Sequence, residues 1–197
     1  MKSITTYARL GLGIAAGALA LTSFAGSASA DEPAATSGTD RTIASTLTSA
    51  ERAQVNAEVA ETMRKAPGGE RIGLNQIAWP EKGAVMTIPL PGETRARAAD
   101  KPIGSRDDGC DYGRVCLWED EVLEGRSLEF YKCKFQKLRW YDFTNKTSSW
   151  VNNQTDGTKS TLYYWTGSKV RSMAQLTAWN YQYYVIPDNK ADFLRVC

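Results

Sequence analysis

Residues 115–133 read VCLWEDEVLEGRSLEFYKC. Residues 115–120 have the composition of a short strand, and residues 121–125 form a turn that ends in glycine. Residues 127–133 then alternate apolar and polar side chains, as a strand with one buried face does. The whole run predicts an antiparallel β-hairpin.

Further strand-like segments continue to the end of the chain. They are residues 148–153, 161–165, 181–186 and 193–197. Helical periodicity is weak throughout, although residues 170–178 suit a short helix or an irregular loop. Many short strands separated by turns predict a mainly β, antiparallel sandwich.

Aromatic residues mark a boundary near Cys110. Residues 31–109 contain one aromatic side chain, Trp79, whereas residues 110–197 contain many. We therefore expect two segments that do not share one kind of core.

The first segment, residues 48–90, is predicted to be a small helix followed by a hairpin. Thr48 and Glu51 fit a capping box at the start of a helix over residues 48–65. An apolar stripe recurs there every four residues, at Val55, Val59 and Met63. Residues 71–79 and 84–90 are strand-like and predict the hairpin. So small a unit has little apolar surface and is marginal alone, so docking on the second segment is the alternative to an independent fold.

Two stretches without apolar periodicity flank this segment. Residues 31–47 are small and polar, and we expect them to be disordered. Residues 91–109 have the composition of a linker. Its residues 95–99, RARAA, are an open target for a protease. The linker is either a plain tether, which we favour, or the end of a pro-segment that is removed after export.

The first 30 residues have the pattern of a signal peptide. Lys2 and Arg9 supply positive charge, residues 10–25 form an apolar core, and residues 28–30 are a small-residue cleavage site. The core is short for a membrane anchor, which needs roughly 20 residues. We expect a secreted, extracellular protein with no membrane segment.

Charge and composition exclude several function classes. Lys2 and Arg9 account for the formal net charge of +2, so the remaining chain is balanced. A nucleic-acid or anionic-membrane partner would favour a basic excess. The sequence contains no histidine, which removes imidazole bases and Ser-His or Cys-His nucleophile pairs. Carboxylates are the catalytic groups that remain, and residues 119–121 are the tight carboxylate cluster, for which we favour a solvated turn over a glycosidase pair. We predict no catalytic residue, no cofactor-binding residue and no enzyme.

The four cysteines, Cys110, Cys116, Cys133 and Cys197, suit a disulfide framework. In an oxidising compartment they form two disulfides, with three possible connectivities. A zinc site is the weaker interpretation, because no two cysteines have the two-residue spacing common in such sites.

Eight residues of the aromatic segment form a recognisable pattern of cysteine, leucine, aromatic, glycine and serine positions. They are Cys110, Cys116, Leu117, Trp118, Gly125, Cys133, Ser148 and Ser149. This run resembles a βγ-crystallin Greek-key unit. It is most similar to the secreted proteins grouped with the Streptomyces-type metalloproteinase inhibitor. The resemblance implies a Greek-key sandwich over residues 110–197 and a secreted protease as partner, and we expect a monomer.

The resemblance also assigns roles to single residues. It implies that Gly125 takes a positive φ in a folded-over hairpin, whose backbone the Ser149 hydroxyl binds. It favours a Cys110–Cys116 disulfide, which a turn at Gly113 would also allow. Cys133 then pairs with Cys197. The rival pairing joins Cys110 to Cys133.

Calcium-binding members of the crystallin group suggest two turns as weak calcium sites. The candidate ligands are Asn145, Lys146, Ser148, Asp188, Asn189 and Asp192. Calcium prefers six to eight oxygens, including carboxylates. The first turn has Thr144 where an Asn or Asp is expected, and the second has lost both hydroxyls. We favour scaffold turns that retain no tight calcium site.

The sequence supports two functions and leaves the contact surface open. The first is a peptidase inhibitor, for which residues 156–160 and 167–175 are candidate loops, since the later close cysteine pair of the inhibitor is absent. The alternative is a crystallin-like structural or stress module that binds calcium weakly. A sugar-stacking platform is a minor candidate, and we favour core packing for its five residues: Trp165, Trp179, Tyr181, Tyr183 and Tyr184.

Overall fold

The computed structural model describes residues 47–97 and 109–197. All of them belong to one compact unit, residues 34–197. The expected signal peptide, most of the expected disordered stretch and residues 98–108 of the expected linker lie outside the described residues, so the domain limits stay predictions. Within the described ranges, no helix is both long and apolar enough to cross a membrane.

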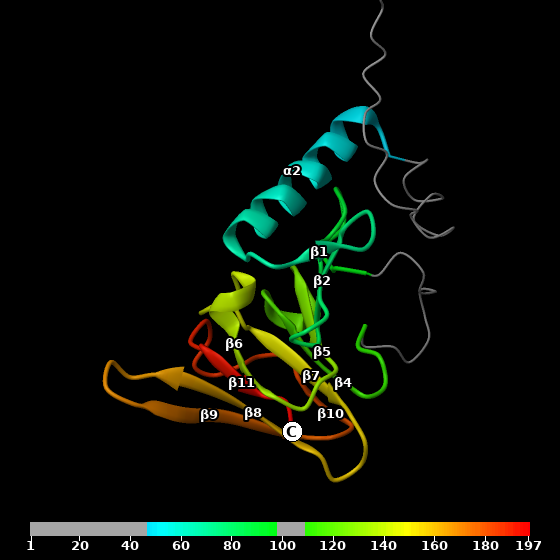
Figure 1. The fold of residues 1–197 in the computed structure, drawn as a ribbon. Helices are drawn as coiled ribbons and strands as arrows, with labels where there is room; N and C mark the ends of the chain where they lie inside the picture. Colours follow the sequence, from blue (N-terminus) through cyan, green and yellow to red (C-terminus); the bar gives the residue numbers. More distant parts are fainter. Residues whose placement is uncertain (1–46, 98–108) are drawn as a thin grey trace, which may run out of the picture. The chain divides into compact units, whose positions relative to one another are not determined.

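The described residues form one α-helix and two antiparallel sheets (Figure 1). The larger sheet contains, in spatial order, β1 (Glu70–Arg71), β2 (Gln76–Trp79), β3 (Ala84–Thr87), β5 (Ser127–Phe130), β4 (Arg114–Trp118), β7 (Ser149–Asn153) and β10 (Asn180–Gln182). The smaller sheet contains β6 (Phe135–Lys137), β11 (Phe193–Arg195), β8 (Lys159–Trp165) and β9 (Val170–Thr177). Short 3-10 helices, η1 (Glu121–Leu123) and η2 (Leu138–Tyr141), follow β4 and β6. The predicted mainly β class is confirmed, whereas the Greek-key connection stays a prediction.

The helix α2 (Ser49–Lys65) begins at the predicted capping box. The Glu51 amide donates to the Thr48 hydroxyl, and the Glu51 carboxylate accepts from the Thr48 amide. Val55 and Val59 are buried. They belong to the same core cluster as Ile77 of β2, so α2 is stabilised by tertiary packing and not by its propensity alone.

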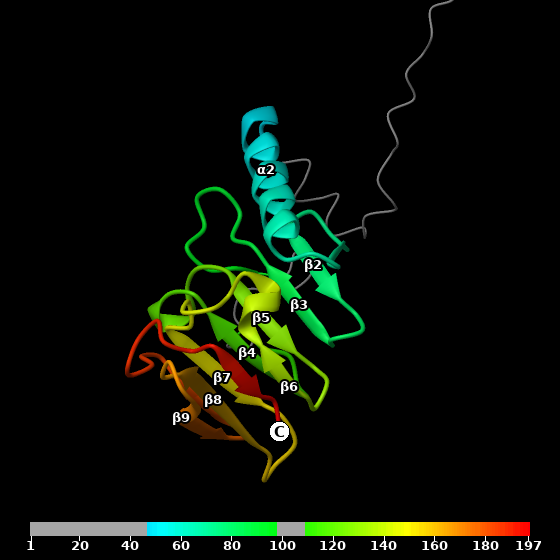
Figure 2. The ribbon, with the colours of Figure 1, turned by 60° about the vertical axis from the view of Figure 1, so that its left-hand side comes forward.

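The hairpin of β2 and β3 is part of the larger sheet, because β3 pairs with β5 (Figure 2). Met86 lies opposite Leu128, and both side chains are buried. The Trp79 ring packs edge-on against Tyr141, with 5.1 Å between ring centroids. The first segment is thus docked on the second, whereas our expectation that the two do not share one kind of core is wrong. The few large side chains of the first segment are buried against the aromatic residues of the second.

The described part of the expected linker, residues 91–97, is held against the turn after β4. The Gly125 amide donates to the Thr94 carbonyl at 2.7 Å, and the Ala96 amide donates to the Gly125 carbonyl at 3.2 Å. The Ala96 side chain is buried, and the Arg95 guanidinium donates to the Val122 carbonyl. Residues 95–97 are therefore not the open protease target that their composition suggests.

The strand β9 corrects the prediction of a helix or loop for residues 170–178. It pairs with β8 along its whole length. A register shift opposite Leu162 and Tyr163 inserts one extra residue, Met173, into β9. As a result Met173 and Ala174 are both partly buried, which removes the strict alternation that identifies a strand from sequence.

The turn after β4 folds back on the larger sheet and is fixed by Ser149. Leu123, at φ 63°, donates its amide to the Ser149 hydroxyl at 2.9 Å. The same hydroxyl donates to the Asp120 carbonyl at 2.7 Å. Gly125 has φ 74°, and a Cβ there would lie 2.6 Å from the Asp120 carboxylate. The roles predicted for Ser149 and Gly125 are confirmed.

We predict that Ser149→Ala destabilises the protein by about 1–3 kcal/mol, because it leaves buried backbone groups without partners. The measurement is the free energy of unfolding from denaturant titration. Ser172→Ala is the matched control, because Ser172 lies exposed on β9 and its loss should change stability by less than about 0.5 kcal/mol. Equal stability of the two variants would contradict the role of the Ser149 hydroxyl.

Candidate functional site

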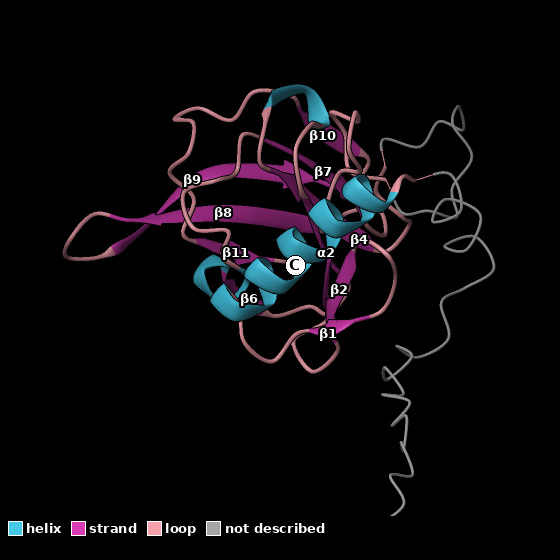
Figure 3. Ribbon diagram, turned by 90° about the horizontal axis from the view of Figure 1, so that it is seen from above, coloured by secondary structure: helices cyan, strands magenta, loops and turns pink. Residues whose placement is uncertain are grey.

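The hairpin of β8 and β9 extends away from the larger sheet (Figures 1 and 3). Its tip, which we call the hairpin tip, is residues 165–170. The side chains of Trp165 and Val170 lie opposite each other there and are 51% and 41% exposed. An aromatic and a β-branched side chain are thus presented together to solvent.

Hydrogen bonds hold the hairpin tip in one conformation. The Thr166 amide and hydroxyl both donate to the Lys169 carbonyl, and the Lys169 amide donates back to the Thr166 hydroxyl at 3.2 Å. Gly167, at φ 94°, supplies the left-handed residue that closes the turn. On the strand side, the Trp165 amide donates to the Asp192 carboxylate at 2.6 Å.

A hollow of about 590 Å³ lies beside the hairpin tip. It is lined by Tyr164, Trp165 and Thr166 of the hairpin, by Asn145, Lys190 and Asp192 of the two candidate calcium turns, and by Pro187. The hairpin tip and the two turns therefore form one surface. The sequence analysis had considered them separately.

The two candidate calcium turns contact each other through hydrogen bonds. The Asn145 amide donates to the Ala191 carbonyl at 2.9 Å, and the Ser148 hydroxyl lies 3.5 Å from the Asn189 side-chain oxygen. Lys146 is directed elsewhere: its ammonium group lies 3.1 Å from Asp142 and 3.5 Å from Glu119.

The carboxylates of the second turn are engaged within the protein. Asp188 accepts from the Asn189 amide group at 2.8 Å, and Asp192 anchors Trp165. In the described ranges, no three acidic, cysteine or histidine side chains gather as a metal cluster. These donors do not fit the six to eight oxygens that calcium takes.

Negative charge is concentrated instead at the folded turn. The pKa of the Asp120 carboxyl is raised, first by burial and then by repulsion from Glu119, Glu124 and Asp188. Arg126 compensates part of this charge, because its guanidinium lies 2.5 Å from Glu119 and 3.5 Å from Asp142.

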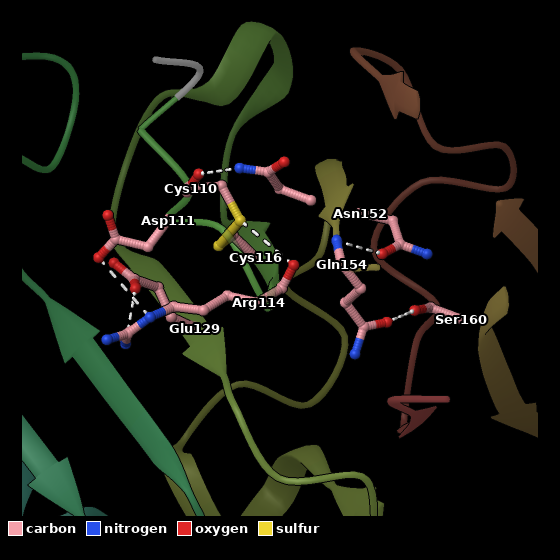
Figure 4. The surroundings of a disulfide bond; sticks show 9 residues. Cys110, Asp111, Arg114, Cys116, Glu129, Asn152, Gln154 and Ser160 are labelled. Atoms are coloured by element: carbon pink, nitrogen blue, oxygen red, sulfur yellow. Dashed lines mark hydrogen bonds and ion pairs between the residues drawn. A yellow bond between two sulfur atoms is a disulfide. The ribbon is translucent and has the colours of Figure 1, made fainter. Parts of the chain in front are cut away.

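The structure contains disulfides between Cys110 and Cys116 and between Cys133 and Cys197. The first lies beside Arg114, whose guanidinium pairs with Asp111 and Glu129 (Figure 4). The second joins Cys197, two residues after β11, to Cys133 in the loop between β5 and β6. The chain geometry and the family resemblance favoured the same two pairs, and the pairing stays a prediction.

The comparison with known families gives one match. Residues 105–177 match the model of peptidase inhibitor family I36. The resemblance drawn from the sequence is thereby confirmed. The family comprises proteins that inhibit peptidases and are not themselves catalytic. None of the curated proteins and none of the solved structures matches the chain.

The I36 match includes the first disulfide, Ser149 and the whole β8–β9 hairpin, and it ends at Thr177, the last residue of β9. Residues 47–97, with α2 and the first three strands, lie outside it. The matched segment is thus packed against an N-terminal segment that the family model does not include.

The two loops proposed from sequence both lie within the matched residues. In residues 156–160, Ser160 is buried, and its hydroxyl donates to the Val196 carbonyl at 2.7 Å. Asp156, Gly157 and Lys159 of the first loop are nevertheless exposed, so both loops are accessible to a partner. The second loop differs in containing an exposed apolar side chain, Val170, opposite Trp165 of the hairpin tip.

The five residues of the sugar-stacking candidate are not core residues. Tyr183 is partly buried, but the other four are exposed: Trp165, Trp179, Tyr181 and Tyr184. The preference for core packing is wrong for these four. Trp165 belongs to the hairpin tip, whereas Trp179 and Tyr181 lie at the end of the larger sheet near β10.

We expect a non-reducing peptide map of the secreted protein to contain one peptide linked through Cys110 and Cys116 and another through Cys133 and Cys197. Reduction before digestion is the control and should release both. A peptide that joins Cys133 to Cys110 or Cys116 would overturn this pairing.

We predict that calcium stabilises the protein only weakly. With a dissociation constant at or above about 10⁻⁴ M, millimolar calcium adds about 1–2 kcal/mol. Thermal melting with calcium, with magnesium and with a chelator measures this effect. A large rise of the melting temperature at micromolar calcium would contradict the prediction.

Proposed function

We propose that the chain is a secreted inhibitor of a metalloprotease and that it binds its target through the hairpin tip. The match to peptidase inhibitor family I36 carries the proposal of inhibition, because the match covers the whole hairpin. The choice of a metalloprotease follows from the resemblance of the cysteine and Ser-Ser pattern to the Streptomyces-type inhibitor.

The stiffness of the hairpin tip supports its role as the protease contact. A partner that binds a flexible loop must order it, which costs about 0.5–1.5 kcal/mol for each immobilised flexible side chain. Here the Thr166 and Lys169 hydrogen bonds have already ordered the turn, and Asp192 fixes the Trp165 backbone. Hydrogen bonds thus take the place of the missing late cysteine pair.

The side chains at the hairpin tip suit a protein interface. Tryptophan is among the residue types that contribute most to protein–protein binding, especially beside a concave surface that excludes water. The exposed Trp165 indole stands at the edge of the 590 Å³ hollow, and Lys169 and Arg171 add positive charge next to it. We expect the target cleft to be apolar with an acidic border.

The extracellular location is part of the same proposal. Two disulfides are stable in an oxidising compartment, and the first 30 residues have the signal-peptide pattern. No single contact in the structure favours the alternative, a structural or stress module with weak calcium binding.

We predict that the protein without residues 1–30 inhibits a thermolysin-like metalloprotease and does not inhibit a subtilisin-like serine protease. Trp165→Ala should raise the inhibition constant at least about tenfold, because it removes the largest side chain of the hairpin tip. The measurement is the inhibition constant from steady-state hydrolysis of a peptide substrate.

Trp179→Ala is the matched control, since it removes an exposed tryptophan outside the hairpin and should leave inhibition unchanged. Melting curves establish that both variants are folded. Absence of inhibition at micromolar protein would refute the metalloprotease proposal and leave the structural module as the better reading. Inhibition that Trp165→Ala does not weaken would refute the role of the hairpin tip alone.

A further inference from the structure

Three exposed aromatic residues surround a second hollow, at the β10 edge of the larger sheet. Tyr112 is 64% exposed, Trp179 is 63% exposed, and Tyr181, in the middle of β10, is 53% exposed. The hollow has a volume of about 370 Å³, and the amide side chains of Asn153 and Asn180 also line it. We call this hollow the aromatic groove.

Trp179 combines an unfavourable backbone conformation with an exposed indole. Its φ is 67°, in the left-handed region that bulky residues rarely adopt. The Trp179 amide donates to the Asn152 carbonyl at 2.8 Å, which holds this conformation. A strained residue that also exposes a large apolar surface points to a function, since neither feature stabilises the fold.

The opposite wall of the groove is rigid. The Cys110–Cys116 disulfide closes the loop that carries Tyr112. The Asn153 amide group donates to the Cys110 carbonyl at 2.8 Å, and the Gly113 amide donates to the Asn153 carbonyl at 2.7 Å. The groove is therefore preformed, and a ligand would not have to order it.

The chemistry of the groove selects the kind of ligand. None of the described residues that line it is charged, so it offers no partner for a phosphate, a carboxylate or an ammonium group. The Tyr112 and Trp179 rings lie 6.1 Å apart between centroids and are inclined at 45°, so that they present two faces at an angle. Aromatic faces combined with a few amide groups suit a neutral ligand that has both apolar faces and hydroxyl groups.

A pyranose ring has this combination. Its axial C–H bonds form an apolar face that attracts the electron-rich face of an aromatic ring, and its equatorial hydroxyls exchange hydrogen bonds with amides. In a β-linked chain of equatorial sugars both C–H faces stay accessible along the chain. We infer that the aromatic groove binds a neutral, β-linked oligosaccharide.

This site is separate from the hairpin tip. Trp179 and Tyr112 belong to the region of the larger sheet, whereas Trp165 lies on β8 of the smaller sheet. The groove therefore gives the protein a second binding activity, which could place it on a glycan surface whether or not it inhibits a protease.

The test is isothermal titration of the protein without residues 1–30 with cellohexaose and with chitohexaose, with tryptophan fluorescence as a second readout. Maltohexaose, which is α-linked, is the control ligand. We expect saturable binding of at least one β-linked probe, a change in indole emission, and at least tenfold weaker binding of maltohexaose.

Variants locate the binding. Trp179→Ala and Tyr112→Ala should each weaken binding at least tenfold, and Trp179→Phe should retain most of it because the aromatic face remains. Trp165→Ala is the matched control and should bind as the unchanged protein does. Melting curves confirm that each variant is folded.

Three outcomes would overturn the inference. They are no saturable binding of either β-linked probe at millimolar concentration, preferential binding of maltohexaose, and binding that Trp179→Ala leaves unchanged. Loss of protease inhibition in Trp179→Ala without any saccharide binding would identify the groove as a protein contact and would equally refute it. Because saccharide binding and inhibition are measured separately, failure of one proposal leaves the other intact.

Discussion

The fold depends on one buried hydroxyl. Ser149 accepts a hydrogen bond from the Leu123 amide and donates one to the Asp120 carbonyl, so it holds the turn after β4 in its folded-over form. Segments from both ends of the described chain attach to that turn. The Val122 amide donates to the Tyr183 carbonyl, and Gly125 exchanges backbone hydrogen bonds with Thr94 and Ala96. Without the folded turn, neither segment would find these partners.

The buried side chain of Arg126 extends this arrangement to the helix. Its guanidinium contacts Glu119 within the same hairpin and the Thr62 hydroxyl of α2. Removing a charged guanidinium from water costs free energy unless it is paired. The Arg126 contacts therefore determine which surfaces pack together, and they add little net stability. The N-terminal segment is thus positioned by polar contacts at the turn and by apolar contacts at Trp79.

Local features were predictable from the sequence, and long-range ones were not. The capping box at Thr48 and the role of Ser149 depend on residues close together in the chain or on a short motif. The pairing of β3 with β5 joins residues 40 to 46 positions apart, and strands of four residues contain no pattern that identifies the partner strand. The composition boundary near Cys110 was misleading, because one core can combine small and aromatic side chains.

Exposure was the hardest property of the candidate site to predict. The alternation of a strand identifies its two faces but not which face is covered, and the extra residue Met173 removed even that alternation from β9. Trp165 and Trp179 are large aromatic residues of a kind that is often buried, and only the tertiary structure shows that they are exposed to solvent.

The two disulfides each stiffen one of the exposed surfaces. Cys110–Cys116 closes the loop that carries Tyr112 and thereby fixes one wall of the aromatic groove. Cys133–Cys197 fastens the end of β11, the strand that pairs with β8 and begins directly after Asp192. Asp192 in turn holds the Trp165 amide. A crosslink that spans 64 residues removes chain entropy from the unfolded state, worth roughly 4 kcal/mol in the chain-entropy account. The same disulfide also restrains the strand next to the β8–β9 hairpin. A surface that is ordered before binding loses less conformational entropy when a partner binds.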